Sequence, residues 1–469
     1  MLLGDDKIEQ IDQAGRHILA HAGVRLLSEG VLKRLHEAGA SVDLNEGIVR
    51  FTGEWLDEIV GNAPRTFTLY SRDGMHDLNI GSGSVYFGNG GRVFRILDMN
   101  TGGFRLTVLK DVAHTARLVN LLENIHFYII ACQAHDISSE FYHLNDFFQA
   151  FRNTSKHVMG GCDSLQGVRQ MWNLACAVAG DEKRLQSEPF VSVITNPISP
   201  LTLDNNTLEI LEFCALKGIP VTCAPAPMAG ATSPVTLAGT LAQMHAESLA
   251  GVALTQVFRP GAPVLYGAVP TAMDMRTMDL TFGSVETAMM NVSAVQLAKR
   301  YHVPIYASAG MTDAKTPDIQ SGFEKGVSLL LVGMAGAEFI HLAAGMLDSG
   351  NSISYEQFII DNEILGMVYR VLRGIEVNED TLAVECVEKL GPGGNYIMED
   401  HTVEHMFDEF FFPSLSVRMN FDLWKERNEP TPLSSARELA HELLQNNEPI
   451  LSPDEIVRIE KQFPDIVNM

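Results

Sequence analysis

The chain is 469 residues long, with 46% hydrophobic and 20% charged residues. Lys and Arg total 34 against 58 Asp and Glu, so the formal net charge is −24. This acidic balance argues against a nucleic-acid-binding protein, which needs a basic surface, and against docking on anionic lipid. The apolar content is high enough for a substantial core and excludes a globally disordered chain.

Compartment and membrane association can be judged from a few segments. Six cysteines with no Cys-x-x-Cys pair indicate reduced thiols rather than a disulfide framework. The first residues have neither a basic stretch nor a long apolar core, so no signal peptide is predicted. Residues 327–347 are mostly apolar but include Glu338 and His341, so a buried helix followed by a buried strand is expected rather than a membrane span. We therefore expect a cytoplasmic protein.

Residues 1–84 are expected to form a helical region followed by a small β segment. Up to residue 66 the chain is interpreted as helical, because apolar residues recur at helical spacing over 8–19 and 32–38. A further short helix is predicted behind Thr52. Between residues 66 and 108, alternating polarity and repeated glycines indicate short strands and turns.

Residues 85–350 alternate between two kinds of segment. Eight short β-prone runs occur, at 85–88, 127–132, 157–161, 190–195, 219–223, 263–268, 303–308 and 338–342. Helical patterns lie between most of them, at 165–179, 204–216, 236–257, 283–301 and 323–334. Such alternation is typical of parallel βα units, and eight units predict an α/β fold of the TIM (β/α)8 barrel type. An open doubly wound sheet is the structural alternative.

Residues 351–469 are predicted to form a C-terminal helical region. Ser435 and Glu438 have the spacing of a capping box, and Ser452 followed by Pro453 marks the start of a last helix. A soluble enzyme of this size is usually a symmetric oligomer. We therefore expect a homo-oligomer, for which this helical region can supply the interface.

The active site of such a barrel lies at the carboxyl ends of its strands. Polar residues at or just after the predicted strand ends are Asn89, Arg92, Gln133, His135, Cys162, Asp163, Asn196, Tyr266 and His341. Asp313 and Lys315 follow the seventh run and form either a substrate-binding pair or a surface charge pair. His341 is either a functional residue or a hydrogen-bonded core residue.

Three other features bear on the site. The uncharged loop 224–234 either lines an apolar pocket, faces a flat apolar ligand held by a partner, or is a stiff connection. Aromatic residues of the C-terminal third, among them Phe358 and Tyr396, are core residues or part of a cage for a quaternary ammonium. No metal site is predicted, because neither a His-Glu-x-x-His motif nor cysteine pairs at zinc spacing occur.

Several segments together are similar to one known family. They are His21–Arg25, Asn196–Leu201, Ala224–Thr232, Asp313–Lys315, Asp318–Lys325, Ala343–Gly350, Gly393–Tyr396 and His401–Thr402. In their order and spacing the chain resembles the trimethylamine methyltransferase superfamily, whose members transfer a methyl group from a methylamine to a corrinoid protein. The resemblance covers nearly the whole chain. It implies a TIM barrel, a cognate corrinoid protein as partner, methyl transfer to Co(I), and no tightly bound cofactor in this chain.

The resemblance also narrows the substrate. The best-known members carry pyrrolysine and act on trimethylamine, whereas this sequence contains only the twenty standard residues. It therefore resembles the non-pyrrolysine branch, which demethylates quaternary amines, and glycine betaine is the leading candidate. The alternatives are a trimethylamine methyltransferase whose pyrrolysine codon is hidden, a quaternary-amine-binding protein without catalysis, and a zinc-dependent barrel methyltransferase.

Roles at the site are assigned as hypotheses on this basis. His341 and Asp313 are the expected catalytic residues, and Asp313 suits the ammonium. The expected substrate-binding residues are Asn89, Arg92, His135, Asn196, Lys315, Phe358 and Tyr396. The residues expected to face the corrinoid are Met228, Ala229 and Gly230.

Overall fold

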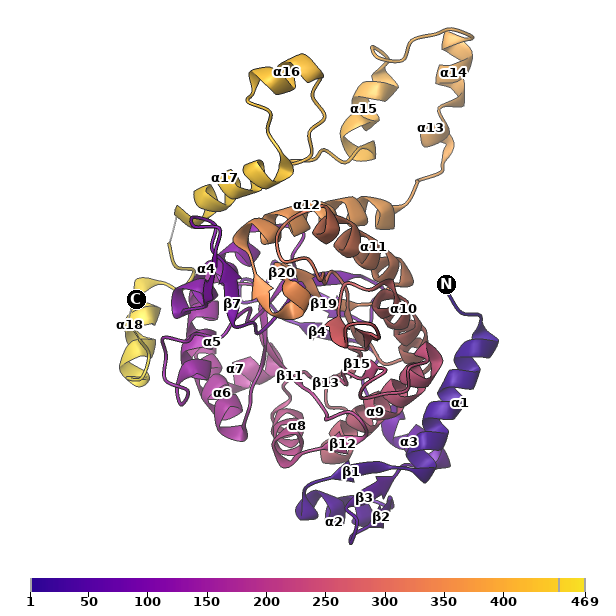
Figure 1. The fold of residues 1–469 in the computed structure, drawn as a ribbon, viewed down its shortest axis with the longest axis vertical. Coiled ribbons are helices and arrows are strands. Elements are labelled where there is room, and N and C mark those ends of the chain that lie inside the picture. The colour runs from indigo at the N-terminus through magenta and orange to yellow at the C-terminus, as the bar shows by residue number, and fades with distance from the viewer. Residues whose placement is uncertain (1, 446–447, 468–469) are drawn as a thin grey trace.

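A closed barrel of eight strands forms the centre of the molecule (Figure 1). The computed structural model describes residues 2–445 and 448–467. The barrel strands are β6 (Tyr86–Asn89), β9 (Phe127–Ile129), β10 (His157–Gly161), β11 (Val191–Thr195), β13 (Val221–Cys223), β15 (Val264–Gly267), β18 (Ile305–Ser308) and β19 (Phe339–Ala344). Neighbouring strands pair in parallel around the ring β10-β11-β13-β15-β18-β19-β6-β9. The closed barrel confirms the predicted fold and excludes the open sheet.

Helices surround the barrel and follow its strands in order. They are α4 (Leu109–Leu121), α5 (Tyr142–Asn153), α6 (Leu165–Ala179), α8 (Asn205–Lys217), α9 (Leu237–Phe258), α10 (Val285–Arg300), α11 (Ile319–Ala335) and α12 (Tyr355–Arg373), with the short α7 (Glu182–Ser187) after α6. Every strand overlaps one of the eight predicted runs, because strands buried on both faces are continuously apolar. The eighth helix, α12, lies beyond residue 350, where the barrel segment was expected to end.

The N-terminal region combines three helices with a small sheet. The helices α1 (Asp5–His21), α2 (Glu29–Glu37) and α3 (Gly53–Gly61) agree with the sequence pattern. The wholly helical interpretation of residues 1–66 was wrong, because β1 (Val24–Leu26), β2 (Ser41–Asp43) and β3 (Ile48–Arg50) form a sheet with β12 (Thr202–Leu203). Strands of three residues are too short to show a period of two.

The amino ends of the barrel strands are closed by a hairpin of β4 (Phe67–Leu69) and β5 (Leu78–Ile80). Its apolar side chains Leu69, Leu78 and Ile80 belong to one buried cluster with Phe127 and Phe339 of the barrel interior. This end is therefore packed and leaves the carboxyl ends of the strands as the place for a site.

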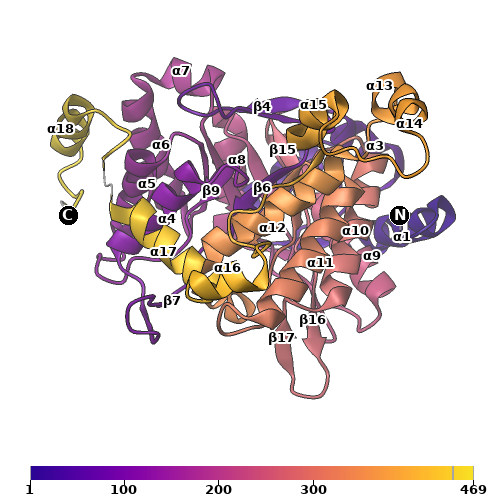
Figure 2. The same ribbon diagram turned by 90° about the horizontal axis from the view of Figure 1, so that it is seen from above.

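Two small sheets stand at the carboxyl ends of the strands. One contains β14 (Met228–Ala229), β16 (Thr271–Asp274) and β17 (Asp279–Thr281); the other contains β7 (Arg95–Leu97), β8 (Phe104–Leu106), β20 (Met346–Leu347) and β21 (Ser352–Ile353), next to the 3-10 turn η1 (Asp348–Gly350). Figure 2 shows β16 and β17 projecting from the side of the barrel opposite β4. We call this side the mouth.

The remaining helices are α13 (Glu379–Leu382), α14 (Val384–Leu390), α15 (Asp400–Glu409), α16 (Phe421–Glu426), α17 (Pro432–Gln445) and α18 (Pro453–Gln462). Residues 374–431, which include α13 to α16, extend away from the barrel and are called the arm (Figure 1). The Ser452 cap of α18 is confirmed, since its side chain accepts a hydrogen bond from the amide of Glu455. The predicted box at Ser435 was wrong, because α17 begins earlier, where Thr431 and Ser434 exchange hydrogen bonds.

Among residues 2–445 and 448–467, every helix is too short or too polar to cross a lipid bilayer.

Candidate functional site

The backbone at the mouth contains several strained positions. Arg92 after β6 and Leu342 in β19 have φ values of 83° and 64°, and the consecutive residues Asp348 and Ser349 have 55° and 50°. A residue with a side chain pays about 1–3 kcal/mol for such a conformation, and these positions concentrate at functional sites. Because all four lie at or beyond strand ends on one side of the barrel, the mouth is the candidate site.

His341 lies inside the barrel near the end of β19. Its ring stacks on Tyr306 with 4.0 Å between centroids, and its Nε2 lies 2.6 Å from Oγ of Ser308. The side chain is only 5% exposed, and burial lowers the pKa of His341 well below its usual value. The imidazole is therefore neutral at physiological pH. Nδ1 has no hydrogen-bond partner among the described residues, which leaves one ring nitrogen for a ligand.

Asp313 connects three loops of the mouth. Its Oδ1 accepts hydrogen bonds from the backbone amide of Phe282 at 2.9 Å and from Oγ of Ser349 at 2.8 Å. Its own amide donates to Oε2 of Glu324, which also accepts from Thr312. Asp313 thus orders loops that follow β17, β18 and β20, and Oδ2 makes no hydrogen bond to any described residue.

Lys315 forms an ion pair at the same edge of the mouth. Its Nζ lies 2.7 Å from Oδ1 of Asp348 and donates to the carbonyl of Asp313 at 3.0 Å. The side chain is 62% exposed, so the ion pair is readily accessible to a ligand. Asp313, Glu324 and Asp348 together give this edge more carboxylates than ammonium groups.

A buried ion pair lies beneath this edge. Nζ of Lys325 on α11 is 3.0 Å from Oδ2 of Asp361 on α12, and both side chains are fully buried. The same ammonium donates to the carbonyl of Gly310 at 2.6 Å, and the same carboxylate oxygen accepts from the amide of Gly345 at 2.7 Å. The pair therefore fixes the backbone immediately after β18 and β19.

A second charged group surrounds Arg92, at the ends of β6 and β10. The guanidinium carbon lies 4.5 Å from the centre of the Tyr142 ring, and Nη1 is 3.2 Å from Oδ1 of Asp163. The other carboxylate oxygen of Asp163, Oδ2, accepts a hydrogen bond from the Tyr142 hydroxyl. Nearby Asp146 is buried, and neither of its carboxylate oxygens has a hydrogen-bond partner within residues 2–445 and 448–467. Burial raises its pKa to about 8.

Three other predicted binding residues bond to the backbone. Asn89 is fully buried, and its side-chain amide bridges β6 to β9 through two bonds to Ile129. His135 is exposed, with Nδ1 3.2 Å from the carbonyl of Thr107. Asn196 is exposed and donates to the carbonyl of Ala224 at 2.6 Å. Asn89 therefore pairs strands, while the other two stand at separate points of the rim.

The two predicted cage aromatics do not lie together. Phe358 of α12 is fully buried and packs against the backbone at Gly345, behind the barrel wall. Tyr396 is 41% exposed and lies in the arm between α14 and α15. Figure 2 shows these two helices on the side of β4, away from the mouth. The structure thus separates both rings from His341 and Asp313.

The residues expected to face the corrinoid lie in the projecting sheet. Met228 and Ala229 form β14, which pairs with β16, and Gly230 follows with a φ of 92°. Ala229 is buried, whereas the turn between β16 and β17 exposes Met275 by 53% and Met278 by 62%. These two methionines are exposed apolar side chains at the tip of the sheet, beside Arg276, which is also exposed.

Sequence reasoning missed several residues that complete the mouth. Tyr306 and Ser308 are two residues apart in β18, so their side chains lie on the same face of the strand. Ser308 is paired with His341 of β19, so His341 shares that face. The spacing of Tyr306 and Ser308 was visible in the sequence. Phe282 gave no signal, because its place depends on a bond from its backbone to Asp313 over a long loop.

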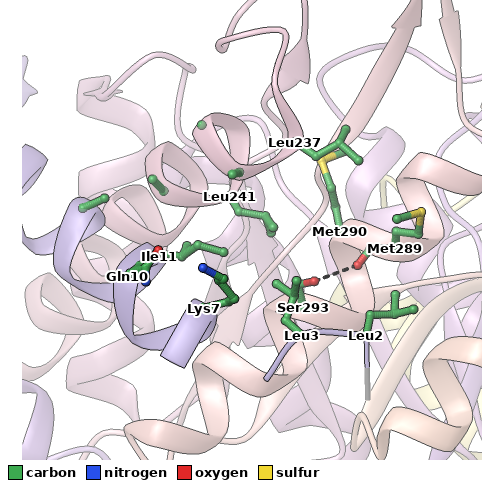
Figure 3. Close-up of a pocket in the computed structure, with 14 residues that line it drawn as sticks. Leu2, Leu3, Lys7, Gln10, Ile11, Leu237, Leu241, Met289, Met290 and Ser293 are labelled. Atoms are coloured by element: carbon green, nitrogen blue, oxygen red, sulfur yellow. Dashed lines mark hydrogen bonds between the residues drawn. The ribbon is translucent and has the colours of Figure 1, made fainter. Parts of the chain in front are cut away.

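An apolar groove of about 580 Å³ lies elsewhere, between α1 and helices α9 and α10 (Figure 3). Its walls include Leu3, Ile11, Leu241 and Met290. The groove is on the outside of the barrel and shares no residue with the mouth.

Comparisons with known proteins identify a family, similar sequences and a solved structure with the same fold. Residues 1–463 match the family model described as trimethylamine methyltransferase. The trimethylamine methyltransferase MttB of Desulfitobacterium hafniense (strain DSM 10664 / DCB-2) is 34% identical over 402 residues, which cover 86% of this chain and 81% of that protein. The glycine betaine methyltransferase of Desulfitobacterium hafniense (strain Y51) is 32% identical over 438 residues, which cover 93% and 91%. The solved monomethylamine methyltransferase (MtmB) of Methanosarcina barkeri has the same fold, with a TM-score of 0.54 at 12% identity and coverage of 96% and 89%.

Proposed function

The chain belongs to the trimethylamine methyltransferase family and is a methyltransferase, and from this we propose that it moves a methyl group from a quaternary amine to a corrinoid protein. Glycine betaine is the proposed substrate. The observation that carries the proposal is the 32% identity to a glycine betaine methyltransferase over 93% of a chain that contains only standard residues.

The chemistry of a quaternary ammonium suits this mouth. Its leaving group is a neutral tertiary amine, so no residue has to supply a proton. The neutral imidazole of His341 adds no positive charge that would repel the substrate. The corrinoid of the partner supplies Co(I), the nucleophile that accepts the methyl group. The residues of this chain then have to hold one N-methyl carbon in line with that acceptor and exclude water.

We assign each charged end of a betaine to a residue of the opposite charge. The carboxylate of Asp313 and the ring of Phe282, whose amide it holds, suit the ammonium. Lys315, which is exposed at the same edge, suits the substrate carboxylate. Arg92 is the alternative anchor, because its buried Nε and Nη2 have no hydrogen-bond partner among the described residues.

The corrinoid protein is proposed to dock over the turn between β16 and β17. Met275 and Met278 expose apolar, flexible side chains there, which suit contact with a flat macrocycle held by a partner. The earlier candidates Met228, Ala229 and Gly230 support this turn from the neighbouring strand.

Trimethylamine is the second candidate substrate, since a relative with 34% identity is named a trimethylamine methyltransferase. The coding DNA discriminates the two directly. An in-frame amber codon that was translated as a standard residue would favour trimethylamine, and its absence favours a quaternary amine.

Product analysis tests the proposal. The protein is incubated with a reduced corrinoid protein and glycine betaine labelled with ¹³C in its methyl groups. We expect dimethylglycine to accumulate by NMR as one labelled methyl group leaves each molecule. Unchanged glycine betaine, together with formation of dimethylamine in a parallel incubation with trimethylamine, would overturn the proposal. Binding of glycine betaine without any transfer would favour a binding protein.

A further inference from the structure

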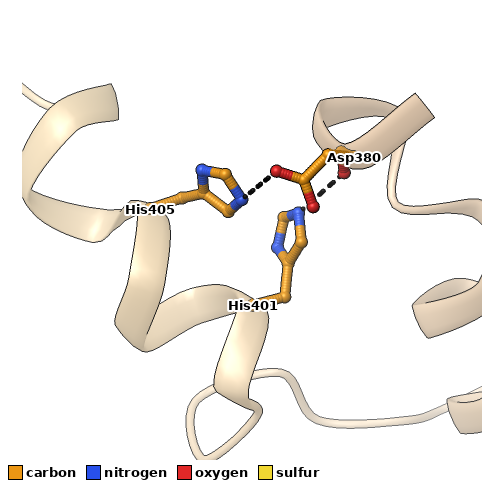
Figure 4. Close-up of side chains that lie close together, drawn as sticks. All are labelled: Asp380, His401 and His405. Carbon is orange, nitrogen blue, oxygen red and sulfur yellow. Dashed lines mark hydrogen bonds and ion pairs between the residues drawn. The ribbon is translucent and has the colours of Figure 1, made fainter. Parts of the chain in front are cut away.

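We propose that the arm binds a divalent transition-metal ion of the zinc class through Asp380, His401 and His405 (Figure 4). The two histidines are four residues apart on α15, so they share one face of the helix. Asp380 comes from the neighbouring helix α13. One potential ligand atom from each of the three residues lies within 4.8 Å of the others.

The side chains are already turned toward a common point. Nε2 of His405 lies 3.1 Å from Oδ2 of Asp380 but has no hydrogen-bond partner among the described residues. Nε2 of His401 lies 3.1 Å from the backbone carbonyl of the same aspartate. The two imidazole rings are 4.4 Å apart between centroids. Both histidines therefore present Nε2 to the same aspartate, His405 to its carboxylate and His401 to its backbone carbonyl.

This arrangement fits the geometry of zinc. Two ligand atoms at about 2.0–2.1 Å from a tetrahedral ion are about 3.4 Å apart, so shifts of about 1 Å or less per side chain close the site. Two imidazoles and one carboxylate fill three positions. A cavity of about 710 Å³ borders Asp380 and His401, which leaves room for water at the fourth position.

The helices of the arm lack a buried core, and a bound metal ion would stabilise their arrangement. In the described part of the chain, α13, α14, α15 and α16 contain no buried residue. Helices of 4 to 10 residues are not stable alone, and small segments without a core need a cross-link. The base of α15 is held to α12, since Arg370 bonds to Glu409 at 3.0 Å. The metal ion would fasten α13 to this anchored helix.

The chain contains a matched control. His17 and His21 on α1 are also four residues apart with stacked rings, but Nδ1 of His21 bonds to its own helix, and no carboxylate in the described part of the chain completes a three-residue group there. Any binding that requires only two helical histidines would occur equally at both places.

The test is calorimetry of the full-length, chelator-treated protein with Zn²⁺, alongside the variants. We expect one ion per chain, and affinity reduced by more than about tenfold in His401→Ala, His405→Ala and Asp380→Asn. The double variant His17→Ala/His21→Ala should bind as the wild type does. We also expect Zn²⁺ to slow proteolysis within residues 374–431 of the wild type and of His17→Ala/His21→Ala, but not of the variants at Asp380, His401 and His405. Absence of binding, or equal binding by His401→Ala/His405→Ala, overturns the proposal.

Discussion

At Asp313, the effect of the negative charge can be separated from the effect of the hydrogen bonds that order the loops. Its two donors, Phe282 and Ser349, both bond to Oδ1. Asn at this position keeps an oxygen for both bonds and removes only the charge, whereas Ala removes both. We predict that Asp313→Asn raises KM for the amine about tenfold with little change in Tm, and that Asp313→Ala also lowers Tm. An unchanged KM in Asp313→Asn would assign Asp313 to loop structure alone.

His341 requires a substitution that preserves packing. His341→Ala would leave a cavity against Tyr306, so it confounds folding with function. Phe fills most of the space and removes both nitrogens. We predict that His341→Phe lowers the rate of methyl transfer at least about tenfold while Tm falls by only a few degrees. Activity equal to wild type would return His341 to the barrel core.

Asp146 predicts a pH dependence of stability. Its pKa in the folded protein is raised to about 8 by burial, so the folded state holds a proton that the unfolded state releases near pH 4. Stability therefore falls as the pH rises between these values, by at most about 1.4 kcal/mol per pH unit. In urea unfolding, the free energy of unfolding of Asp146→Asn relative to that of the wild type should increase from about pH 5 to about pH 8. A constant difference would mean that Asp146 is ionised in the folded protein.

The ion pair beneath the mouth is the residue-scale feature with the largest expected energetic effect. Lys325→Met leaves Asp361 as an unpaired buried carboxylate, and we predict a loss of about 3–5 kcal/mol in the free energy of unfolding. Lys325→Met/Asp361→Leu should recover part of it. The exposed pair of Lys33 and Glu29 is the control, and Lys33→Met should show no measurable change. Equal effects of Lys325→Met and Lys33→Met would contradict this account.

The projecting hairpin of β16 and β17 is the element proposed to bind the corrinoid protein. We predict that Met275→Glu/Met278→Glu raises KM for the corrinoid protein about tenfold and leaves transfer to free corrinoid unchanged. Met75 is the control, because it is 79% exposed in the loop between β4 and β5 at the opposite end of the barrel. Equal loss with both acceptors would place these methionines in the substrate site instead.

Elements were predictable where their pattern was long and repeated. All eight barrel strands followed from short apolar runs, since most of their residues are buried. The helices between most of them followed from apolar residues at helical spacing. The three-residue strands β1 to β3 gave no usable period. The start of α17 was misplaced because Ser435 and Glu438 match a capping box inside the helix, while Thr431 provides the actual cap.

The site was predictable only as a location. Strand ends pointed to His341, Asp313 and Lys315, which the structure brings to one side of the barrel; their roles there stay predictions. The partners of each depended on contacts distant in sequence, such as Ser349 on Asp313. The proposed metal-binding group gave no signal in the sequence, because Asp380 and His401 are 21 residues apart and belong to no standard zinc motif.

At the scale of the whole molecule, the exposed aromatic residues of the arm predict an oligomeric protein. Phe407 on α15, Phe410 directly after it and Phe421 on α16 are 70%, 66% and 65% exposed, and neither helix has a buried residue. Exposed apolar surface of this kind marks a protein interface, and we expect a second copy of the chain to cover it. Sedimentation analysis should show a homo-oligomer that Phe407→Glu/Phe410→Glu converts to a smaller species. A monomeric wild type would contradict this expectation.

The central claim is methyl transfer from a quaternary amine to a corrinoid. The most direct measurement mixes the protein with a reduced corrinoid protein and challenges it with glycine betaine, proline betaine, carnitine, choline or trimethylamine, while cobalt absorbance is followed. The account predicts conversion of Co(I) to methyl-Co(III) with a quaternary amine, foremost glycine betaine, and none with trimethylamine. Conversion with trimethylamine alone would contradict it.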